Sequence, residues 1–305
     1  MATNDTRLIA VFGATGQQGG GVVRALKADG RFEVRALTRD PDKYRGPADE
    51  VVLADLERPD TLSAALANAH GVFLVTNFWQ EGTDEIKQAT AAIQAAKVAG
   101  VDHFIWSTLP DVRAISGGKF NLPQFTGKAK VDPLVQDAGF PHHTFVVPPA
   151  YYSNFSGTFG PQKQPDGSFG WVLPIDPAVR CIHAGDIGEL GDIVAGAFEH
   201  PGRVGNGTYL PLVGDFLSFN DIIRTLGQQG HRISYTQVSQ AEFANFFPGA
   251  DAIGETLAYY EAYTYLGPHS HDDEIAVANE VAGKAPTNFA SWARDNFKFG
   301  AASVA

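Results

Sequence analysis

One stretch near the start of the chain constrains the fold more than any other. Five apolar residues, 8–12, run directly into a turn that contains Gly13, Gly16 and Gly19, and an amphipathic segment at 21–29 follows. A continuous apolar run is typical of a strand buried on both faces of a parallel sheet. Glycines allow a sharp turn and a close ligand approach, and a helix N-terminus attracts anions. The stretch therefore predicts a strand, a turn and a helix that bind a dinucleotide pyrophosphate, rather than an ordinary glycine-rich turn.

Strand and helix patterns then alternate up to about residue 150. We expect further strands at 33–38, 51–54, 71–76, 103–107 and 144–147, and helices at 61–69, 83–99 and 128–137. This alternation is typical of an α/β protein with a Rossmann-type doubly wound parallel sheet. We assign residues 1–150 to an NAD(P)-binding Rossmann domain.

The regular alternation stops after this domain. Residues 148–177 are rich in proline, glycine and aromatic residues, which favours an extended crossover. Beyond it we expect a strand at 233–238 and helices at 186–199, 221–228, 242–247, 256–266 and 287–296. Residues 151–305 should thus form a smaller, mainly helical lobe for a substrate or partner, and part of 178–210 should return to the Rossmann domain. The lobe is expected to close over the carboxyl ends of the strands, where open α/β sheets bind ligands.

Composition excludes several classes of function. The net charge of the 305-residue chain is −11, and its 23 Lys and Arg residues are spread along it, which argues against direct nucleic-acid binding. With Cys181 as its one cysteine, the chain forms no intrachain disulfide. The polar residues 1–5 do not resemble a signal peptide, and no apolar run reaches the roughly 20 residues needed to cross a bilayer. We therefore expect a cytoplasmic protein without a membrane partner.

The end of the second expected strand predicts which nicotinamide cofactor binds. An acidic residue at this point binds ribose hydroxyls, whereas a cation suits a 2′-phosphate. Arg39 stands there, and its guanidinium matches a phosphate in shape and charge. We therefore expect NADP(H) to be preferred over NAD(H). The alternative is that Arg39 is a solvated turn residue paired with Asp40.

Other strand ends supply further candidate cofactor contacts. Asp55 and Leu56 follow the third strand, where they would line the adenine, and Thr76 and Asn77 follow the fourth, beside the nicotinamide. The aromatic residues 78 and 79 that come next would either line this site or belong to the core.

A series of motifs resembles one known family. The motifs are GATGQQGG, ALTRDP, VTNFW, FTGKAKVDPLVQDAGFPHHTFVVPPAYYSNF, PQKQPDGSFGWVLPI and FPGADAIGETLAYYEAY. Together, from residue 8 to about 297, they look like the NmrA-like family of atypical short-chain dehydrogenases/reductases. The chain is most similar to the NADP(H)-sensing redox-sensor branch of that family, whereas other members reduce quinones, triphenylmethane dyes or isoflavone-type substrates.

The resemblance also implies roles for particular residues. It implies a pyrophosphate loop of Gly13, Thr15, Gly16, Gln17, Gln18 and Gly19, a 2′-phosphate ligand in Arg39, and a nicotinamide site of Asn77, Lys128, Tyr151 and Asn154. One position departs from the family pattern. Thr90 stands where the family often has a lysine, which puts a cofactor contact from that position in doubt.

The usual proton donor of short-chain dehydrogenases is missing. Their mechanism pairs a tyrosine with a lysine four residues later, and no such pair exists here, because Gln124 precedes Lys128 by four residues. Lys128 is the candidate catalytic residue: it would hold the ribose or donate a proton itself, as in isoflavone-type reductases. The alternative is a solvated helix lysine.

Other catalytic and metal sites are disfavoured. His269, His271, Asp272 and Asp273 lack regular ligand spacing, so we expect a polar surface loop and no metal site. The sequence contains no Gly-x-Ser-x-Gly elbow, which disfavours a Ser/His/Asp hydrolase. Two functions remain. The chain is either a redox sensor with little catalysis that signals to a protein partner, or an NAD(P)H-dependent reductase of small aromatic, quinone-like or conjugated molecules.

Overall fold

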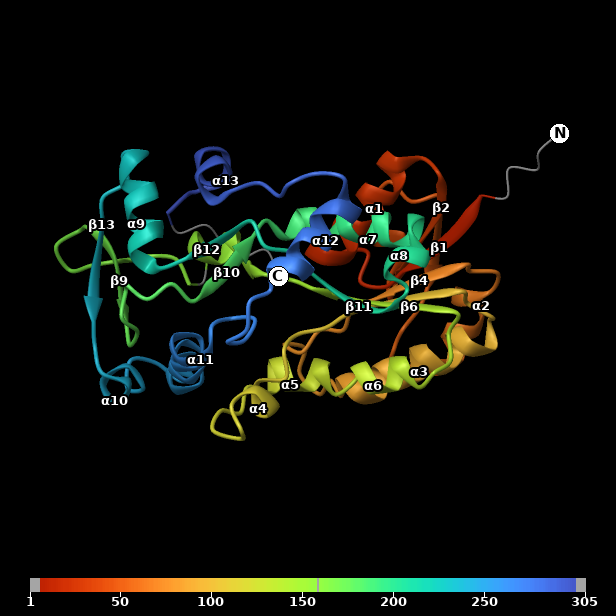
Figure 1. Cartoon of the computed structure of the whole chain (residues 1–305), viewed down its shortest axis with the longest axis horizontal. Coiled ribbons are helices and arrows are strands. Elements are labelled where there is room, and N and C mark those ends of the chain that lie inside the picture. Colours follow the sequence, from red (N-terminus) through yellow and green to blue (C-terminus); the bar gives the residue numbers. More distant parts are fainter. Residues whose placement is uncertain (1–5, 158, 300–305) are drawn as a thin grey trace.

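The computed structural model describes residues 6–157 and 159–299, so the polar residues 1–5 lie outside it. Its largest sheet has seven strands, all parallel, in the order β11-β6-β5-β4-β1-β2-β3 (Figure 1). The strands are β1 (Arg7–Val11), β2 (Phe32–Thr38), β3 (Glu50–Leu53), β4 (Gly71–Leu74), β5 (His103–Ser107), β6 (His142–Val147) and β11 (Asn206–Pro211). This sheet confirms the expected Rossmann-type α/β fold.

The strand order reverses at β1, which lies between β2 and β4. Because the sheet is parallel, the carboxyl ends of these three strands meet at one edge. Open α/β sheets bind their ligands in the crevice at such a reversal. The glycine turn at 12–16 and the loop at 75–84 both begin there.

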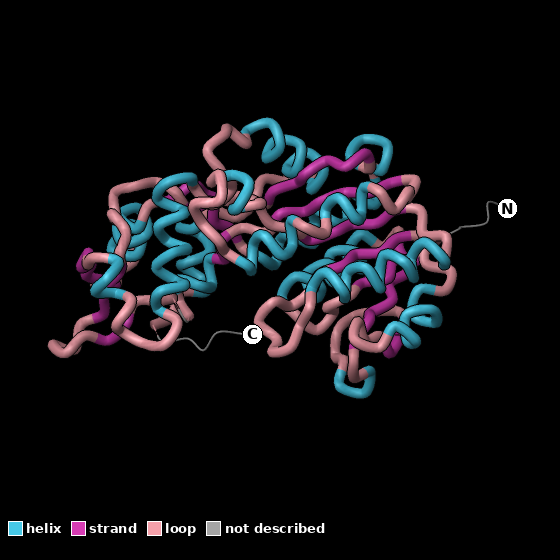
Figure 2. The backbone as a smooth tube through the Cα atoms, turned by 90° about the horizontal axis from the view of Figure 1, so that it is seen from below, coloured by secondary structure: helices cyan, strands magenta, loops and turns pink. Residues whose placement is uncertain are grey.

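Helices cover both faces of this sheet, so that it is the middle of three layers (Figures 1 and 2). One face packs against α1 (Gln17–Asp29), α7 (Leu190–Glu199) and α12 (Asp272–Ala282). The other packs against α2 (Leu62–Leu66), α3 (Glu85–Val98) and α6 (Asp132–Gln136). Most residues of the inner strands β1, β2, β4, β5 and β6 are buried, which matches their apolar runs, whereas the edge strands β3 and β11 are partly exposed.

The helix expected over 128–137 is wrong, because two short helices occupy this part of the chain. They are α5 (Pro123–Ala129) and α6. Pro133 lies in the first turn of α6, where its missing N–H costs nothing, whereas inside one longer helix it would break the hydrogen-bond ladder. Pro133 therefore sets the boundary between the two helices.

The second part of the chain contains two small sheets besides its helices. Their strand orders are β12-β10-β7 and β13-β9-β8. The strands are β7 (Ala150–Tyr151), β8 (Gln162–Lys163), β9 (Phe169–Leu173), β10 (Ile182–Gly185), β12 (Asp215–Leu217) and β13 (Ile233–Gln237). The helices are α9 (Phe219–Gln228), α10 (Gln240–Phe243), α11 (Ala250–Tyr263) and α13 (Phe289–Asn296). The stretch 148–177, expected as an extended crossover, thus supplies three short strands.

Short elements complete the chain. They are α4 (Val112–Ile115), α8 (Pro201–Val204) and the 3₁₀ turns η1 (Pro41–Lys43), η2 (Pro59–Thr61), η3 (Tyr152–Phe155) and η4 (Ile187–Glu189). Residues 187–211 lie on the large sheet, since α7 packs on α1 and β11 pairs with β6. The loop expected around His271 is wrong at Asp272 and Asp273, which begin α12. Within 6–157 and 159–299, no helix combines the length and apolar character that a membrane span requires.

Candidate functional site

The glycine turn after β1 uses its three glycines in different ways. Gly13 has a φ of +66°, which L side chains rarely adopt, and its carbonyl accepts a hydrogen bond of 2.9 Å from the Gly16 N–H. A Cβ on Gly19 would lie 2.3 Å from the Gly13 oxygen, so the helix can approach the turn only without a side chain. A Cβ on Gly16 would meet nothing closer than 3.4 Å. Open space for a ligand is therefore found at Gly16.

The residues at the start of α1 fit an anionic ligand. No side chain caps the helix at Gly16, and its first turn carries no acidic residue. Gly13, Thr15 and Gly16 are exposed, and Gln17 is half-buried. The backbone N–H groups and the partial positive charge of this terminus therefore meet no competing carboxylate, as a pyrophosphate would require.

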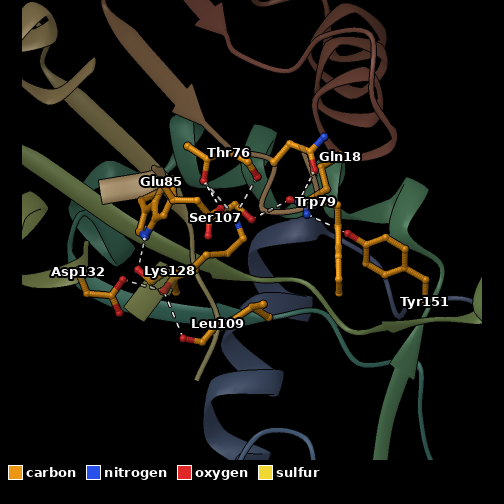
Figure 3. Close-up of polar contacts among 12 residues, drawn as sticks. Gln18, Thr76, Trp79, Glu85, Ser107, Leu109, Lys128, Asp132 and Tyr151 are labelled. Carbon is orange, nitrogen blue, oxygen red and sulfur yellow. Dashed lines mark hydrogen bonds and ion pairs between the residues drawn. The ribbon is translucent and has the colours of Figure 1, made fainter. Parts of the chain in front are cut away.

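Gln18 connects the glycine turn to two other elements. Its amide donates to the Tyr151 hydroxyl at 2.9 Å, and its carbonyl accepts from the Ser107 hydroxyl at 2.7 Å (Figure 3). Ser107 ends β5 and Tyr151 ends β7, so the contact joins α1, the large sheet and the small sheet β12-β10-β7. Burial raises the pKa of Tyr151, which keeps its hydroxyl protonated. Sequence reasoning identified Gln18 and Tyr151 but missed Ser107.

Arg39 lies exposed directly after β2. Its Nη1 donates to Gln80 Oε1 at 2.8 Å. Asp40 does not pair with it, because this carboxylate forms an ion pair of 2.7 Å with Lys43. The alternative that pairs Arg39 with Asp40 is therefore wrong, and the guanidinium lies beside the loop that follows β4.

The structure spreads the remaining predicted contacts around the same edge. Asp55 accepts from the Glu57 N–H at 3.0 Å, and Leu56 packs against the core under α2 and α3. Asn77 is exposed, and Asn154 lies half-buried in η3. Asp55 and Leu56 follow β3 and Asn77 follows β4, as the sequence predicted, whereas Asn154 follows β7, a strand that the sequence analysis did not expect.

The aromatic residues after β4 are not core residues. Trp79 is 77% exposed, and its ring meets the half-buried Phe78 ring edge-on at 5.1 Å. The Trp79 N–H donates to Asn77 Oδ1 at 3.1 Å, which shapes the loop. An exposed indole at this edge offers a stacking surface for a flat molecule.

Lys128 is buried, so its interpretation as a solvated helix lysine is wrong. Its ammonium group donates to Glu85 Oε1 at 2.7 Å, to the Thr76 carbonyl at 2.9 Å and to the Thr76 hydroxyl at 3.1 Å (Figure 3). These three bonds use every N–H that an ammonium group carries. The Glu85 side chain is only 5% exposed. Lys128 thus lies in a buried ion pair that uses all of its own N–H groups, whereas Glu85 Oε2 is buried without a hydrogen-bond partner. Sequence reasoning missed Glu85.

The electrostatic balance at Lys128 follows from this burial. Desolvation lowers the pKa of Lys128, while the charge and hydrogen bond of Glu85 oppose the change. The Trp106 ring, 5.4 Å from Nζ, covers one side of the group. Gln124, which occupies the usual tyrosine position, donates to Thr256 Oγ1 at 3.3 Å and so connects α5 to α11.

Thr90 lies on α3, the helix that begins with Glu85, and Asp132 begins α6. Thr90 donates to the Ile86 carbonyl at 2.7 Å, so its hydroxyl is used within α3. Asp132, which sequence reasoning missed, accepts from Thr108 at 2.7 Å and from the Tyr209 hydroxyl at 2.8 Å. Burial raises the pKa of Asp132 to about 6. In the described part of the chain, no three His, Cys, Asp or Glu side chains are grouped as a metal site would require.

A seven-strand parallel sheet with an uncapped glycine turn at its reversal defines a doubly wound α/β protein of the NAD(P)-binding type. Comparison with known families gives the particular family. The NmrA-like family matches residues 5–293, and the chain belongs to it.

Two relatives that carry the family name agree with this assignment. An NmrA-like family domain-containing protein of Dictyostelium discoideum is 28% identical, over 89% of this chain and 93% of that protein. An NmrA-like family domain-containing oxidoreductase of Aspergillus hancockii is 31% identical, over 92% of this chain and 91% of its own length.

Solved structures show the same fold. NmrA, a negative transcriptional regulator, matches in complex with NADP at a TM-score of 0.77 and 23% identity, covering 96% of this chain and 95% of NmrA. It matches equally well in complex with NAD, at a TM-score of 0.78. The NADPH-dependent quinone oxidoreductase of Escherichia coli matches at 0.74 and 20% identity, over 93% of this chain and 97% of the enzyme.

Proposed function

We propose that this protein binds NADP(H) in preference to NAD(H) and acts as a redox sensor with little catalysis of its own. The observation that carries the proposal is the buried Lys128, whose N–H groups are all bound to Glu85 and Thr76. The candidate proton donor is thereby occupied, while the glycine turn and Arg39 remain accessible at the sheet edge.

Different residues at this edge would contact different parts of the cofactor. The start of α1 would hold the pyrophosphate, and the exposed Arg39 would hold the 2′-phosphate. Asp55 and Leu56 would lie beside the adenine, and Asn77, Tyr151 and Asn154 would surround the nicotinamide. The known NmrA complexes contain NADP or NAD, so the preference proposed here depends on Arg39.

Catalysis is expected to be slow because hydride transfer to a carbonyl needs a matched proton. A bound nicotinamide would supply the hydride, and the chain would have to supply the proton. Without a placed donor the rate falls by a factor of roughly 10²–10⁴. Lys128 could donate only by breaking its ion pair with Glu85.

A second candidate function is reduction of quinone-like or conjugated molecules. Several relatives are named oxidoreductases, and a quinone oxidoreductase shares the fold. Such acceptors need a placed proton less, because their anions are delocalised or are protonated by water. The exposed Trp79 and the nearby Phe78 would stack against a flat acceptor.

Calorimetry of the unmutated protein and of Arg39→Ala tests the cofactor preference. NADPH should bind about 1.5–3 kcal/mol more tightly than NADH, roughly tenfold or more, because NADH lacks the phosphate that Arg39 recognises. Arg39→Ala should remove most of this difference. Lys43→Ala is the matched control, since its charge is paired with Asp40. Equal affinities in the unmutated protein would refute the preference.

Turnover assays separate the sensor from the reductase. NADPH oxidation is followed with a panel of quinones, enones and aldehydes, and protease sensitivity is compared with and without NADPH. A sensor should turn over none of them but should change its protease sensitivity, because a signal needs two states that the ligand distinguishes. Steady quinone turnover would establish the reductase instead.

A further inference from the structure

The hydrogen bond between Arg39 and Gln80 joins the two sides of the strand reversal. Arg39 follows β2, and Gln80 lies in the loop between β4 and α3. The residues are 41 apart in sequence, yet Nη1 and Oε1 lie 2.8 Å apart. Since β2 and β4 flank β1, this contact spans the edge at which the glycine turn begins.

The chemistry of arginine lets one guanidinium serve two partners. Gln80 accepts from Nη1, and a guanidinium binds a phosphate through a pair of parallel N–H groups. The Nε and Nη2 edge offers such a pair while Nη1 stays on the amide. Gln80 carries no charge, so it orients the arginine without neutralising it.

We propose that Gln80 is a positioning residue for cofactor selectivity: it orients Arg39 toward a 2′-phosphate and couples that phosphate to the loop at 77–84. This inference rests on the proposed binding of NADP(H). Because NAD(H) has no 2′-phosphate, it gains nothing from the oriented guanidinium.

The backbone of the loop shows how the coupling reaches Trp79. The Gln80 N–H donates to the Asn77 carbonyl at 3.4 Å, and the Gln80 carbonyl accepts from the Thr83 N–H at 3.2 Å. Asp84 then caps α3 by accepting from the Lys87 N–H at 3.0 Å. Fixing the Gln80 side chain therefore restrains a series of turns that carries the exposed indole.

The first test compares Gln80→Met with the unmutated protein in calorimetry. Methionine keeps the length of the side chain but is at best a weak acceptor. NADPH affinity should fall roughly three- to tenfold, a loss comparable to that of one ordinary hydrogen bond, and NADH affinity should not change. Gln228→Met, on the exposed end of α9, controls for a surface methionine.

The second test uses Trp79 as a reporter of the loop. The other three tryptophans, 106, 171 and 292, are at most 7% exposed, so acrylamide quenching reports mainly on Trp79, which is 77% exposed. Oxidised cofactors are used because reduced nicotinamide absorbs tryptophan emission. Saturating NADP⁺ should shield the indole more than saturating NAD⁺, and Gln80→Met should abolish the difference. Trp79→Phe verifies the source of the signal.

Four results would overturn the inference. A rise in NADPH affinity in Gln80→Met would show that Gln80 competes with the phosphate. An equal fall for NADPH and NADH would show a purely structural role for Gln80. If Gln80→Met changes neither the preference for NADPH over NADH nor the shielding of Trp79 from acrylamide, Gln80 does not couple the phosphate to the loop. The proposed function would still stand in that case. If the unmutated protein binds both cofactors equally, the proposed preference itself fails, and the inference with it.

Discussion

At the scale of single residues, the pair Lys128 and Glu85 is expected to dominate stability near the site. Lys128→Met would leave Glu85 as an unpaired charge whose side chain is 5% exposed. Breaking a buried ion pair from one side costs about 3–5 kcal/mol, because the remaining charge has lost its partner and gains no water. Urea unfolding of Lys128→Met should show this loss.

The double variant Glu85→Gln/Lys128→Met is the control for that prediction. It removes both charges and keeps both side chains at similar length, so it should lose much less than the sum of the single variants. Additive losses would mean that the two groups do not interact. Because Lys128 stabilises the fold through this pair, loss of turnover in a Lys128→Ala variant would not by itself identify Lys128 as a proton donor.

At the scale of elements, the glycine turn predicts different effects at two of its positions. Gly16 has an extended backbone with φ −90° and ψ 179°, and a Cβ there meets nothing closer than 3.4 Å. Gly16→Val should therefore keep the fold, at a capping cost of about 1 kcal/mol or less, but abolish NADPH binding by filling the space for the pyrophosphate. Thermal unfolding and calorimetry measure the two effects.

Gly19→Ala provides the contrast. Its Cβ would lie 2.3 Å from the Gly13 oxygen, so α1 or the turn must shift, and the melting temperature should fall. NADPH binding at unmutated affinity in Gly16→Val would show that the phosphate site lies elsewhere.

Local patterns were sufficient to predict most elements of the fold. The apolar runs predicted the first six strands of the large sheet, and the helix expected at 221–228 corresponds to α9. The strand β11 was missed because its place depends on pairing with β6, where Tyr209 stacks on Phe145 at 4.6 Å. The helix α12 was missed because its acidic first turn was interpreted as a loop, although acidic residues also favour a helix N-terminus.

Local patterns likewise predicted some residues of the candidate site and not others. Gly13 and Arg39 stand at positions that a strand, a turn and a helix specify within a short stretch of chain. Glu85 is 43 residues from Lys128, and no spacing indicates which of the 34 acidic residues meets a given lysine. Only the folded sheet brings such residues together, so Glu85, Gln80 and Ser107 could not be predicted from the sequence.

At the scale of the whole molecule, two buried groups give the stability opposite dependences on pH. His103, at the start of β5, has a pKa lowered to about 3, chiefly by burial and further by electrostatic interactions with His142, His70, His143 and Arg7. In the unfolded chain a histidine takes up a proton near pH 6.5. Between these values the unfolded state binds the extra proton, so His103 makes stability fall as the pH falls.

Asp132 acts in the opposite sense. Burial raises its pKa to about 6, above the usual value of about 4 in unfolded chains. The folded state therefore binds the extra proton between pH 6 and about 4, so this group adds stability as the pH falls through that range. At neutral pH the buried charge costs stability instead.

Two neutral variants should therefore change the pH dependence of the free energy of unfolding in opposite directions. His103→Gln keeps a donor for Thr144 Oγ1, which His103 Nε2 contacts at 2.9 Å, but it cannot titrate. The free energy of unfolding decreases as the pH falls from 6 to 4, and His103→Gln should make this decrease smaller by about 1.4 kcal/mol per pH unit. Asp132→Asn should make the same decrease larger by a similar amount. This variant should be more stable than the unmutated protein at pH 7. Urea unfolding across pH 4–7 measures these slopes, and profiles parallel to that of the unmutated protein would contradict both assignments.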